Sequence, residues 1–163
     1  MDLDNFRIIA AASKKEFSGF IDNLADRIPG NMPEIAASAD KAVWKKIQCL
    51  DCANCCKTMT PAYNKADILR IATHLRMKPK DFISRWLKKE KDSEAWVNAS
   101  SPCQFLDGNM CTIYEYRPED CAGFPHHDKQ PFEAYISTFR KNVNHCPATH
   151  EFVAQLMDKI DLG

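Results

Sequence analysis

The sequence predicts a mainly α-helical protein, folded as a single small helical domain around a cysteine-rich centre, with one short β-hairpin. Apolar residues recur at steps of three and four towards both ends of the chain, which is the spacing of one helix face. Cysteines and turn residues interrupt this periodicity in the middle. With 163 residues, of which 45% are hydrophobic, the chain is long enough to bury a core.

The first elements are two helices within residues 3–48. Apolar residues from Phe6 to Ile28 line one face of a long helix that a Pro-Gly pair ends. A second helix begins near Pro33, because proline fits the first turn of a helix, and it leads to the first cysteine, Cys49.

Two further helices are predicted before the second group of cysteines. Asn64, followed by Asp67 three residues later, forms an N-cap pattern in front of helically spaced apolar residues. Pro79 opens another helix, which buries Phe82. We interpret the charged run at residues 88–92 as the solvated end of that helix.

The predicted hairpin lies between Cys103 and Tyr116. Two β-favouring runs flank Asp107-Gly108-Asn109, which is a short turn signal. Arg117-Pro118 then predicts a turn that enters a short helix.

The C-terminal part of the sequence is again helical in character. Apolar residues at 132–139 fit one helix, and a last helix is predicted over residues 147–161. No repeat, low-complexity tract or linker divides the chain. We therefore predict one domain over residues 1–163, with a cysteine-cluster core over about residues 49–146 and N-terminal helices at 3–48.

Charge and hydropathy exclude several classes of protein. Lys plus Arg and Asp plus Glu number 22 each, so no broad positive field exists to hold nucleic acid or an anionic membrane surface. We recognise neither an export signal nor an apolar run long enough to cross a bilayer. We expect a cytoplasmic protein with no nucleic-acid or membrane partner, and a protein partner stays open.

Eight cysteines carry the chemistry of this sequence. In a reducing compartment such a number predicts metal binding before disulfides. Thiolates are the soft ligands that zinc and iron-sulfur clusters prefer, and each such site takes about four of them. We predict a cysteine-rich metal-binding centre, in one site or two, whose candidate ligands are Cys49, Cys52, Cys55, Cys56, Cys103, Cys111, Cys121 and Cys146.

The first four cysteines allow two arrangements. In a helix, Cys49, Cys52 and Cys56 share one face. In a loop, Cys55 replaces Cys56, and the three thiols wrap one cluster in a C-x-x-C-x-x-C run. The last four cysteines are too widely spaced for a local motif, so tertiary folding must gather them.

The identity of the metal follows less directly from the pattern. Zinc modules usually carry two C-x-x-C knuckles, and this chain has no second knuckle after the first dense group. This favours an iron-sulfur cluster of the [4Fe-4S] type slightly, with zinc as a close alternative. His126 and His127 are further candidates, either as ligands or as donors to sulfur.

At these residues the chain resembles the YkgJ-type cysteine-cluster family, the C-x-x-C-x-x-C-C zinc- or iron-chelating domain. Cys49–Cys56 matches the opening motif, and Pro102–Leu106 resembles the C-x-F-L segment of the family. Cys111–Pro118 resembles its C-x-I-Y-x-x-R-P, and Cys121–Pro125 resembles its C-x-x-F-P. The resemblance implies metal chelation through the cysteines.

The resemblance also implies an alternative function. Flagellin lysine-N-methylase looks like an enzyme relative of this domain, with an iron-sulfur cluster and S-adenosylmethionine, so the alternative is an iron-sulfur enzyme of methyl-transfer or redox type. The present sequence contains no glycine-rich nucleotide loop. We therefore predict a metal-binding protein first, and we expect the metal to order residues 48–63 and 100–128.

Overall fold

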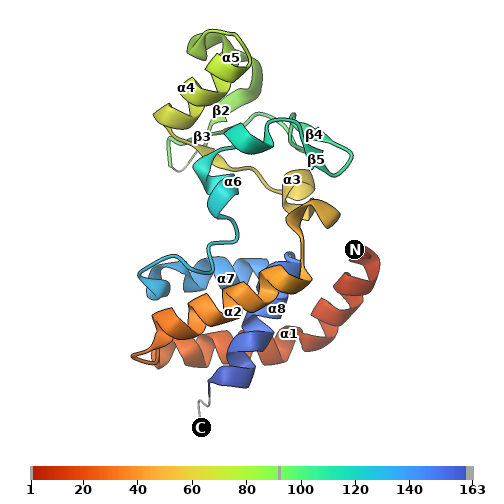
Figure 1. Ribbon diagram of the computed structural model, residues 1–163, viewed down its shortest axis with the longest axis vertical. Helices are drawn as coiled ribbons and strands as arrows, with labels where there is room; N and C mark the ends of the chain where they lie inside the picture. The colour runs from red at the N-terminus through yellow and green to blue at the C-terminus, as the bar shows by residue number, and fades with distance from the viewer. Residues whose placement is uncertain (1, 92, 161–163) are drawn as a thin grey trace. The chain divides into compact units, whose positions relative to one another are not determined.

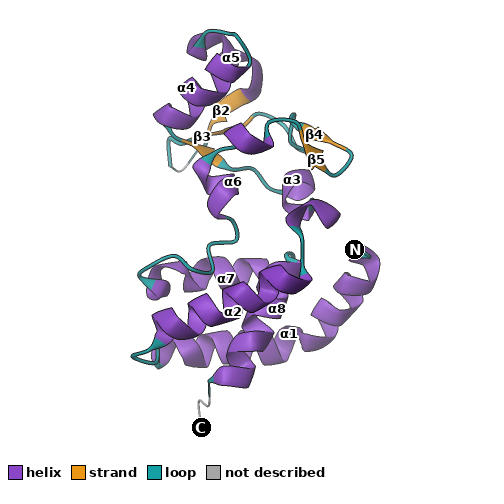
Figure 2. Ribbon diagram, in the orientation of Figure 1, coloured by secondary structure: helices purple, strands orange, loops and turns teal. Residues whose placement is uncertain are grey.

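The computed structural model describes residues 2–91 and 93–160. These residues are mainly helical, with a few short strands, as predicted (Figure 2). The chain forms two compact units: unit 1 contains the described residues of 1–52 and 125–163, and unit 2 those of 53–124. The single domain expected from the sequence stays a prediction.

All regular secondary structure in the described part of unit 1 is helical. In Figure 1, α8 (blue) packs against α1, α2 and α7. All four helices were predicted, and residue 161 of the last predicted one lies outside the described residues. The elements are α1 (Leu3–Asp26), α2 (Met32–Lys46), the 3-10 turns η1 (Cys49–Asp51) and η3 (Phe132–Tyr135), α7 (Ile136–Asn142) and α8 (Pro147–Lys159).

Local signals set the starts of these helices. The side chain of Asp2 accepts hydrogen bonds from the backbone N–H groups of Asp4 and Asn5 at the start of α1, at 2.9 and 3.1 Å. Pro33 in α2 and Pro147 in α8 occupy the first turn, where a backbone N–H has no partner within the helix.

Apolar side chains from all four helices meet in one core. Phe152 is fully buried, and its ring lies 5.5 Å from that of Phe139. The helix faces predicted by periodicity are largely the buried ones, although Ile9 on the predicted face of α1 is 48% exposed and Ile21 is buried instead. The buried members are Phe17, Ile21, Leu24, Met32, Ala36, Ala39, Val43, Phe132, Ile136, Phe139, Val143, Ala148, Phe152, Val153, Leu156 and Ile160.

Unit 2 is built from shorter elements. Strands β1, β3 and β2 form an antiparallel sheet in that order, and β4 pairs with β5 in the predicted hairpin, whose turn contains Gly108 at φ +58°. The elements are α3 (Asn54–Thr58), β1 (Ala62–Tyr63), α4 (Lys65–His74), α5 (Pro79–Trp86), β2 (Leu87–Lys89), β3 (Trp96–Asn98), β4 (Leu106–Asp107), β5 (Met110–Cys111), the 3-10 turn η2 (Tyr114–Tyr116) and α6 (Glu119–Gly123).

The three-stranded sheet was missed from the sequence. Residues 88–92 were interpreted as a helix end, but α5 ends at Trp86, and β2 starts at Leu87 (residue 92 lies outside the described part). Leu87 is buried and pairs with Asn98, whereas Lys88 and the following lysine remain exposed. Lysine on an exposed edge strand is a common protection against further strand pairing.

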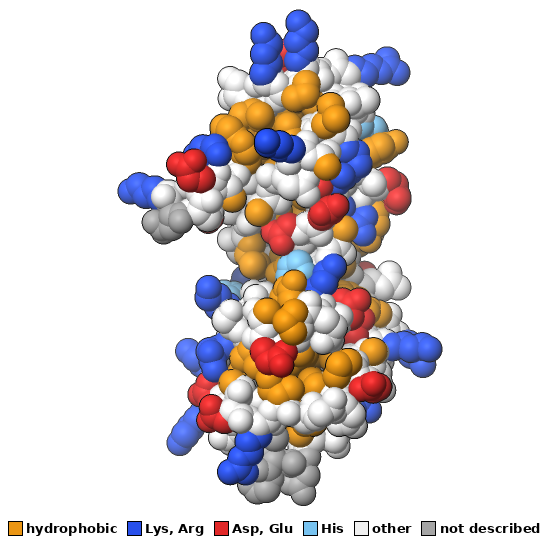
Figure 3. Space-filling view, turned by 90° about the vertical axis from the view of Figure 1, so that its left-hand side faces the viewer, with side chains coloured by type: hydrophobic (Ala, Val, Ile, Leu, Met, Phe, Trp, Pro, Cys, Tyr) orange, Lys and Arg blue, Asp and Glu red, His pale blue; other side chains and the backbone are white. Residues whose placement is uncertain are grey.

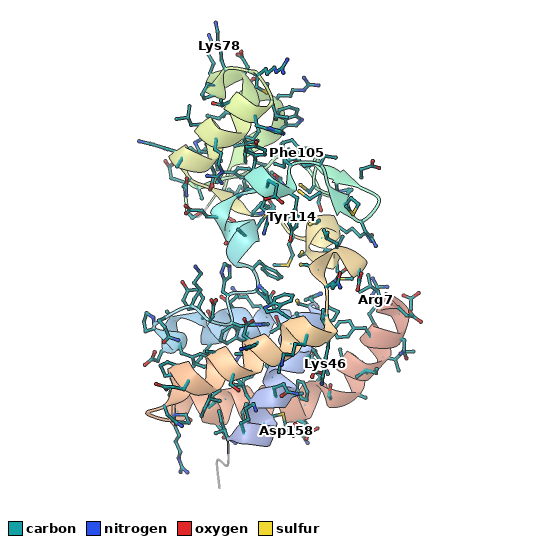
Figure 4. The ribbon with its side chains drawn as sticks, in the orientation of Figure 1. Arg7, Lys46, Lys78, Phe105, Tyr114 and Asp158 are labelled. Carbon is teal, nitrogen blue, oxygen red and sulfur yellow. The ribbon has the colours of Figure 1, made fainter. Side chains whose placement is uncertain are left out.

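The core of unit 2 is small and rich in aromatic residues. Phe82 of α5 is fully buried, and its ring lies 5.4 Å from Trp86 and 6.2 Å from Phe105, which Figure 4 labels. These contacts pack α5 against the segment that leads into the hairpin. The buried members are Tyr63, Ile68, Ile71, Ala72, Phe82, Leu87, Phe105 and Ile113.

The surface agrees with the balanced composition. Figure 3 shows lysine and arginine side chains interspersed with aspartate and glutamate on the face that it draws. A helix both long and apolar enough for a membrane span does not occur among the described residues.

Candidate metal centre

The first cysteine segment is not a continuous helix. Cys49 begins the turn η1, Ala53 adopts φ +47° in the left-handed region, and α3 starts only after it. Because a right-handed helix cannot continue through a positive φ, the arrangement in which Cys49, Cys52 and Cys56 share one helix face does not form. The segment is a turn followed by a short helix.

The described chain divides the cysteines between the two units. None of the eight is in a disulfide. Unit 2 contains Cys55, Cys56, Cys103, Cys111 and Cys121, and unit 1 contains Cys49, Cys52 and Cys146.

Hydrogen bonds hold α3 against the hairpin region of unit 2. The N–H of Cys103 donates to the carbonyl oxygen of Cys56 at 2.8 Å, which brings the backbones of two cysteines together. The hydroxyl of Ser101 donates to the carbonyl oxygen of Lys57 at 2.9 Å, and Lys57 Nζ donates to Asn109 Oδ1 at 2.7 Å. The predicted hairpin therefore presents its cysteines next to α3.

Cys111 is placed by the hairpin itself. It lies on β5 opposite Leu106, and the next residue, Thr112, donates its N–H to the carbonyl oxygen of Phe105 at 2.8 Å. Cys103 lies three residues before Leu106, whose N–H bonds to the Cys103 carbonyl oxygen at 3.0 Å. The strand pairing fixes the backbone of Cys111, and the hydrogen bond to Leu106 fixes that of Cys103 just before the hairpin.

Cys121 lies in α6, whose start is fixed by a carboxylate from α4. Asp67 is 1% exposed, and its Oδ1 accepts the N–H of Glu119 at 3.1 Å. Asp67 also forms the predicted capping box with Asn64, and Arg70 donates to its Oδ1 at 2.5 Å. The N-cap pattern therefore also positions the helix of a distant cysteine.

The thiols of unit 2 act on one another electrostatically. Burial is the main cause that raises the pKa of Cys103, Cys111 and Cys121, and negative charge on neighbouring thiols raises these pKa values further. Negative charge on Cys56 raises the pKa of each of the three, and the pKa of Cys121 is also raised by Cys103 and Cys111. These four side chains therefore share one partly buried environment.

Cys56 differs from the other three. A hydrogen bond from the thiol of Cys55, with the two Sγ atoms 3.9 Å apart, is the main cause that lowers the pKa of Cys56 to about 7, against the opposing effect of burial. The positive charge of Lys57 lowers it further. Cys56 is therefore the thiol of this group that gives up its proton most readily.

The four thiols of unit 2 suit zinc or iron by their chemistry, but their positions do not form a metal-binding geometry. Four thiols from α3, the hairpin region and α6 match the soft, four-coordinate environment that both metals accept. Within residues 2–91 and 93–160, no three His, Cys, Asp or Glu side chains have a metal-binding arrangement. Metal binding would therefore have to draw these thiols closer together.

The thiols of unit 1 occupy different surroundings. Cys146 is the N-cap residue of α8, and burial is the main cause that raises its thiol pKa. Backbone and side-chain hydrogen bonds from Thr149 oppose this effect. Cys52 is buried, and its Sγ lies 3.9 Å from the carbonyl oxygen of Cys49. Unit 1 thus contributes three thiols, one fewer than a thiolate-only metal site requires.

His127 belongs to the core of unit 1. Its Nδ1 lies 3.0 Å from Asp40 Oδ1, its Nε2 lies 3.3 Å from Thr149 Oγ1, and its ring stacks on Phe152 at 4.1 Å. Both ring nitrogens therefore have partners within the protein, which assigns this residue a packing role. The ring of His126 lies 5.7 Å from that of Tyr135, and its role as a ligand stays a prediction.

Sequence reasoning missed three polar residues beside the unit 2 thiols. The buried Tyr63 donates its hydroxyl to Asn98 Oδ1 at 2.7 Å, and Gln104 Nε2 donates to the same oxygen at 3.1 Å. Burial is the main cause that raises the pKa of Tyr63, and Cys103 is the next. The signals were a polar Asn98 inside a β-favouring run and a Gln directly after Cys103.

Comparison with known families gave one match. Residues 48–147, which include all eight cysteines, match the family model described as "CxxCxxCC: Putative zinc- or iron-chelating domain". Neither the curated proteins nor the solved structures gave a match.

Proposed function

Because the chain belongs to the CxxCxxCC family of zinc- or iron-chelating domains, we propose that it holds a metal ion or an iron-sulfur cluster through Cys56, Cys103, Cys111 and Cys121. The observation that carries this proposal is the hydrogen bond of 2.8 Å between the Cys103 N–H and the Cys56 carbonyl oxygen, and the electrostatic effect of the four thiols of unit 2 on one another supports it. Burial raises the pKa of three of them, which favours the protonated thiol, and a bound cation would stabilise their charged forms.

We propose that one thiol, Cys56, is the first to bind the metal. Cys56, whose pKa is lowered to about 7, supplies a thiolate near neutral pH. A metal attracted by this thiolate would then displace the protons of the other three thiols, whose pKa values burial raises. Cys55 would support the site by donating its S–H to Cys56.

The proposal also concerns which metal the four thiols bind. A thiolate-only set of four serves a [4Fe-4S] cluster as well as zinc, so we keep the cluster as the first proposal and zinc as its alternative. Eight thiols outside any disulfide are compatible with a reducing compartment, and we propose the cytoplasm. We assign no reaction to the site.

Metal analysis of anaerobically purified protein tests the proposal. We expect stoichiometric metal, with a broad visible absorption band for iron-sulfur or a colourless protein for zinc. Single serine substitutions at Cys56, Cys103, Cys111 and Cys121 should each lower the metal content. The matched control is Cys146→Ser, because Cys146 is also partly buried but belongs to unit 1.

Two outcomes would contradict the proposal. If the protein contains no metal after both aerobic and anaerobic purification, and all eight thiols can be titrated, the proposal that it binds metal is wrong. If Cys146→Ser loses the metal while Cys121→Ser keeps it, the site does not consist of the four thiols proposed here.

A further inference from the structure

Asn98 is a polar residue buried beside the proposed metal site. It is the last residue of β3, it is 1% exposed, and its Cα pairs with that of Leu87. Its backbone N–H donates to Thr60 Oγ1 at 2.8 Å. The strand pairing and this hydrogen bond hold the backbone of Asn98, and they therefore fix the position from which its side chain extends.

The carbonyl oxygen of the Asn98 side chain already has two donors. Tyr63 donates its hydroxyl at 2.7 Å, and Gln104 donates Nε2 at 3.1 Å. An amide oxygen has two lone pairs, so these bonds use its full capacity as an acceptor. The two hydrogen bonds also fix the plane of the amide group, because rotating the amide would break them.

The nitrogen of the same amide has no such partner. Within the part of the chain that the structure describes, Asn98 Nδ2 is buried without a group in hydrogen-bond geometry. Buried N–H groups are almost always paired in folded proteins, so this one indicates a nearby partner with which it is not in hydrogen-bond geometry in this structure. Gln104 Oε1 is also unpaired, but it is an acceptor and has no hydrogen to offer sulfur.

Cys103 carries the thiol that the chain brings towards this nitrogen, because Gln104, the next residue, donates Nε2 to Asn98 Oδ1 at 3.1 Å. A side-chain hydrogen-bond interaction with Asn98 also lowers the pKa of Cys103, against the larger effect of burial. Cys103 in turn lies beside the carbonyl of Cys56, with which its N–H bonds at 2.8 Å. The unpaired nitrogen thus borders the proposed ligand set.

We propose that Asn98 Nδ2 donates a hydrogen bond to the Cys103 thiolate when that thiolate holds metal, which makes Asn98 a positioning residue of the metal centre. This inference rests on the proposed function. An N–H···S bond to a ligating thiolate stabilises the charge on sulfur and fixes the direction of its remaining lone pairs. The Tyr63 and Gln104 bonds hold the amide ready for this role.

Cobalt(II) is the probe for the first test, because its thiolate complexes absorb in the near ultraviolet and visible. Asn98→Asp keeps the shape and the acceptor of the Tyr63 and Gln104 bonds but places an oxygen opposite sulfur. We expect cobalt affinity to fall by about 10- to 100-fold. The sulfur-to-cobalt charge-transfer band should move to longer wavelength, because the sulfur orbital rises in energy without the donor.

The matched control is Asn142→Asp, the same change at a buried asparagine in α7 of unit 1. It should leave both cobalt affinity and the band position unchanged. A purely structural role of Asn98 would lower stability without moving the band, so the band separates the two explanations.

A second measurement needs no variant. In wild-type protein loaded with cadmium-113, we expect a through-bond coupling between the metal and one side-chain amide proton of Asn98. If wild-type protein binds cobalt but Asn98→Asp changes neither affinity nor band, and no coupling is seen, the inference is wrong while the proposed function stands. If Asn98→Asp does not fold, the cadmium coupling alone decides. Wild-type protein that binds neither cobalt nor cadmium would overturn this inference, whereas the proposed function would fail only if metal analysis of the purified protein also found no metal.

Discussion

Unit 1 and unit 2 are held together in different ways. In unit 1 four helices, the longest with 24 residues, bury one continuous apolar core. In unit 2 the longest helix has 10 residues and the longest strands have three, and a smaller core is supplemented by polar side chains such as Asp67 and Asn98. Short elements bury little surface each, so unit 2 depends more on specific polar and cysteine interactions.

The buried polar groups show the same contrast. In unit 1, His127, Asp40 and Thr149 form a network whose members bond to one another. In unit 2, Asp67 and Asn98 connect elements that carry the cysteines, and one atom of Asn98 remains unpaired. The polar residues of unit 1 therefore bond to one another inside its core, whereas those of unit 2 connect the elements that carry the proposed metal ligands.

The largest expected effect is that of metal removal. Metal binding contributes on the order of 10 kcal/mol to the folding of zinc-finger peptides, and unit 2 contains the proposed ligands. Chelation should therefore increase hydrogen exchange from Cys103 to Cys121, while α1 and α8 keep most of their protection. Equal protection of the Cys103–Cys121 segment with and without metal would show that the metal does not stabilise unit 2.

The next comparison removes one buried ring from each unit. Phe152→Ala in unit 1 and Phe82→Ala in unit 2 each delete a fully buried aromatic side chain, at an expected cost of about 3–5 kcal/mol. Hydrogen exchange should rise in the unit that carries the change. Thermal unfolding of metal-loaded protein measures the cost, and Ile8→Ala, at a side chain that is 70% exposed, is the control. A cost below that of the control at either ring would contradict the assigned core.

A smaller effect is expected at the polar link between α4 and α6. Asp67→Asn keeps the shape and one acceptor oxygen but removes the charge that Arg70 and the N–H of Glu119 contact. The side chain of Arg70 is 35% exposed, so solvent screens part of the ion pair, and we expect a loss of about 1–3 kcal/mol in urea unfolding.

Asp4→Asn is the control for this change, because Asp4 pairs with Arg7 on the surface and the expected loss is below about 0.5 kcal/mol. Exchange of the Glu119 amide should be faster in Asp67→Asn than in wild type. Unchanged exchange would mean that Asp67 does not hold the start of α6.

The smallest expected effect is a pH dependence of unit 1. Burial lowers the pKa of His127, although Asp40 and Asp128 oppose this and His126 adds to it. Below the ordinary pKa of about 6.5, the unfolded chain therefore binds a proton that the folded chain does not, and stability falls as the pH decreases. His127→Gln should reduce this slope without abolishing it, since burial also lowers the pKa of His150.

Chemical unfolding at a series of pH values from 7.5 to 5 measures this slope. His150→Gln is the matched variant, because its ring lies half-buried in the same unit. An identical slope in wild type and in His127→Gln would show that His127 does not contribute to it.

Local sequence signals located most of the helices and indicated the metal chemistry. Periodicity located α1 and α8, the Asn64–Asp67 pattern located the start of α4, and the Asp107-Gly108-Asn109 turn located the hairpin. These signals succeed because each depends on residues within a few positions of one another. The cysteine count indicated metal, because thiolate chemistry does not depend on where the ligands lie in the chain.

The grouping of the cysteines, in contrast, depends on contacts between distant parts of the chain. Cys56 and Cys103 are distant in sequence, and the bond between their backbones depends on the folding of unit 2. The short strand β2 was misread because local charge suggested a helix end, whereas pairing with β3 and burial of Leu87 stabilise the strand. Asn98 looked like an ordinary polar residue, and only packing placed its amide beside a thiol. Such pairings are long-range, so no local pattern encodes them.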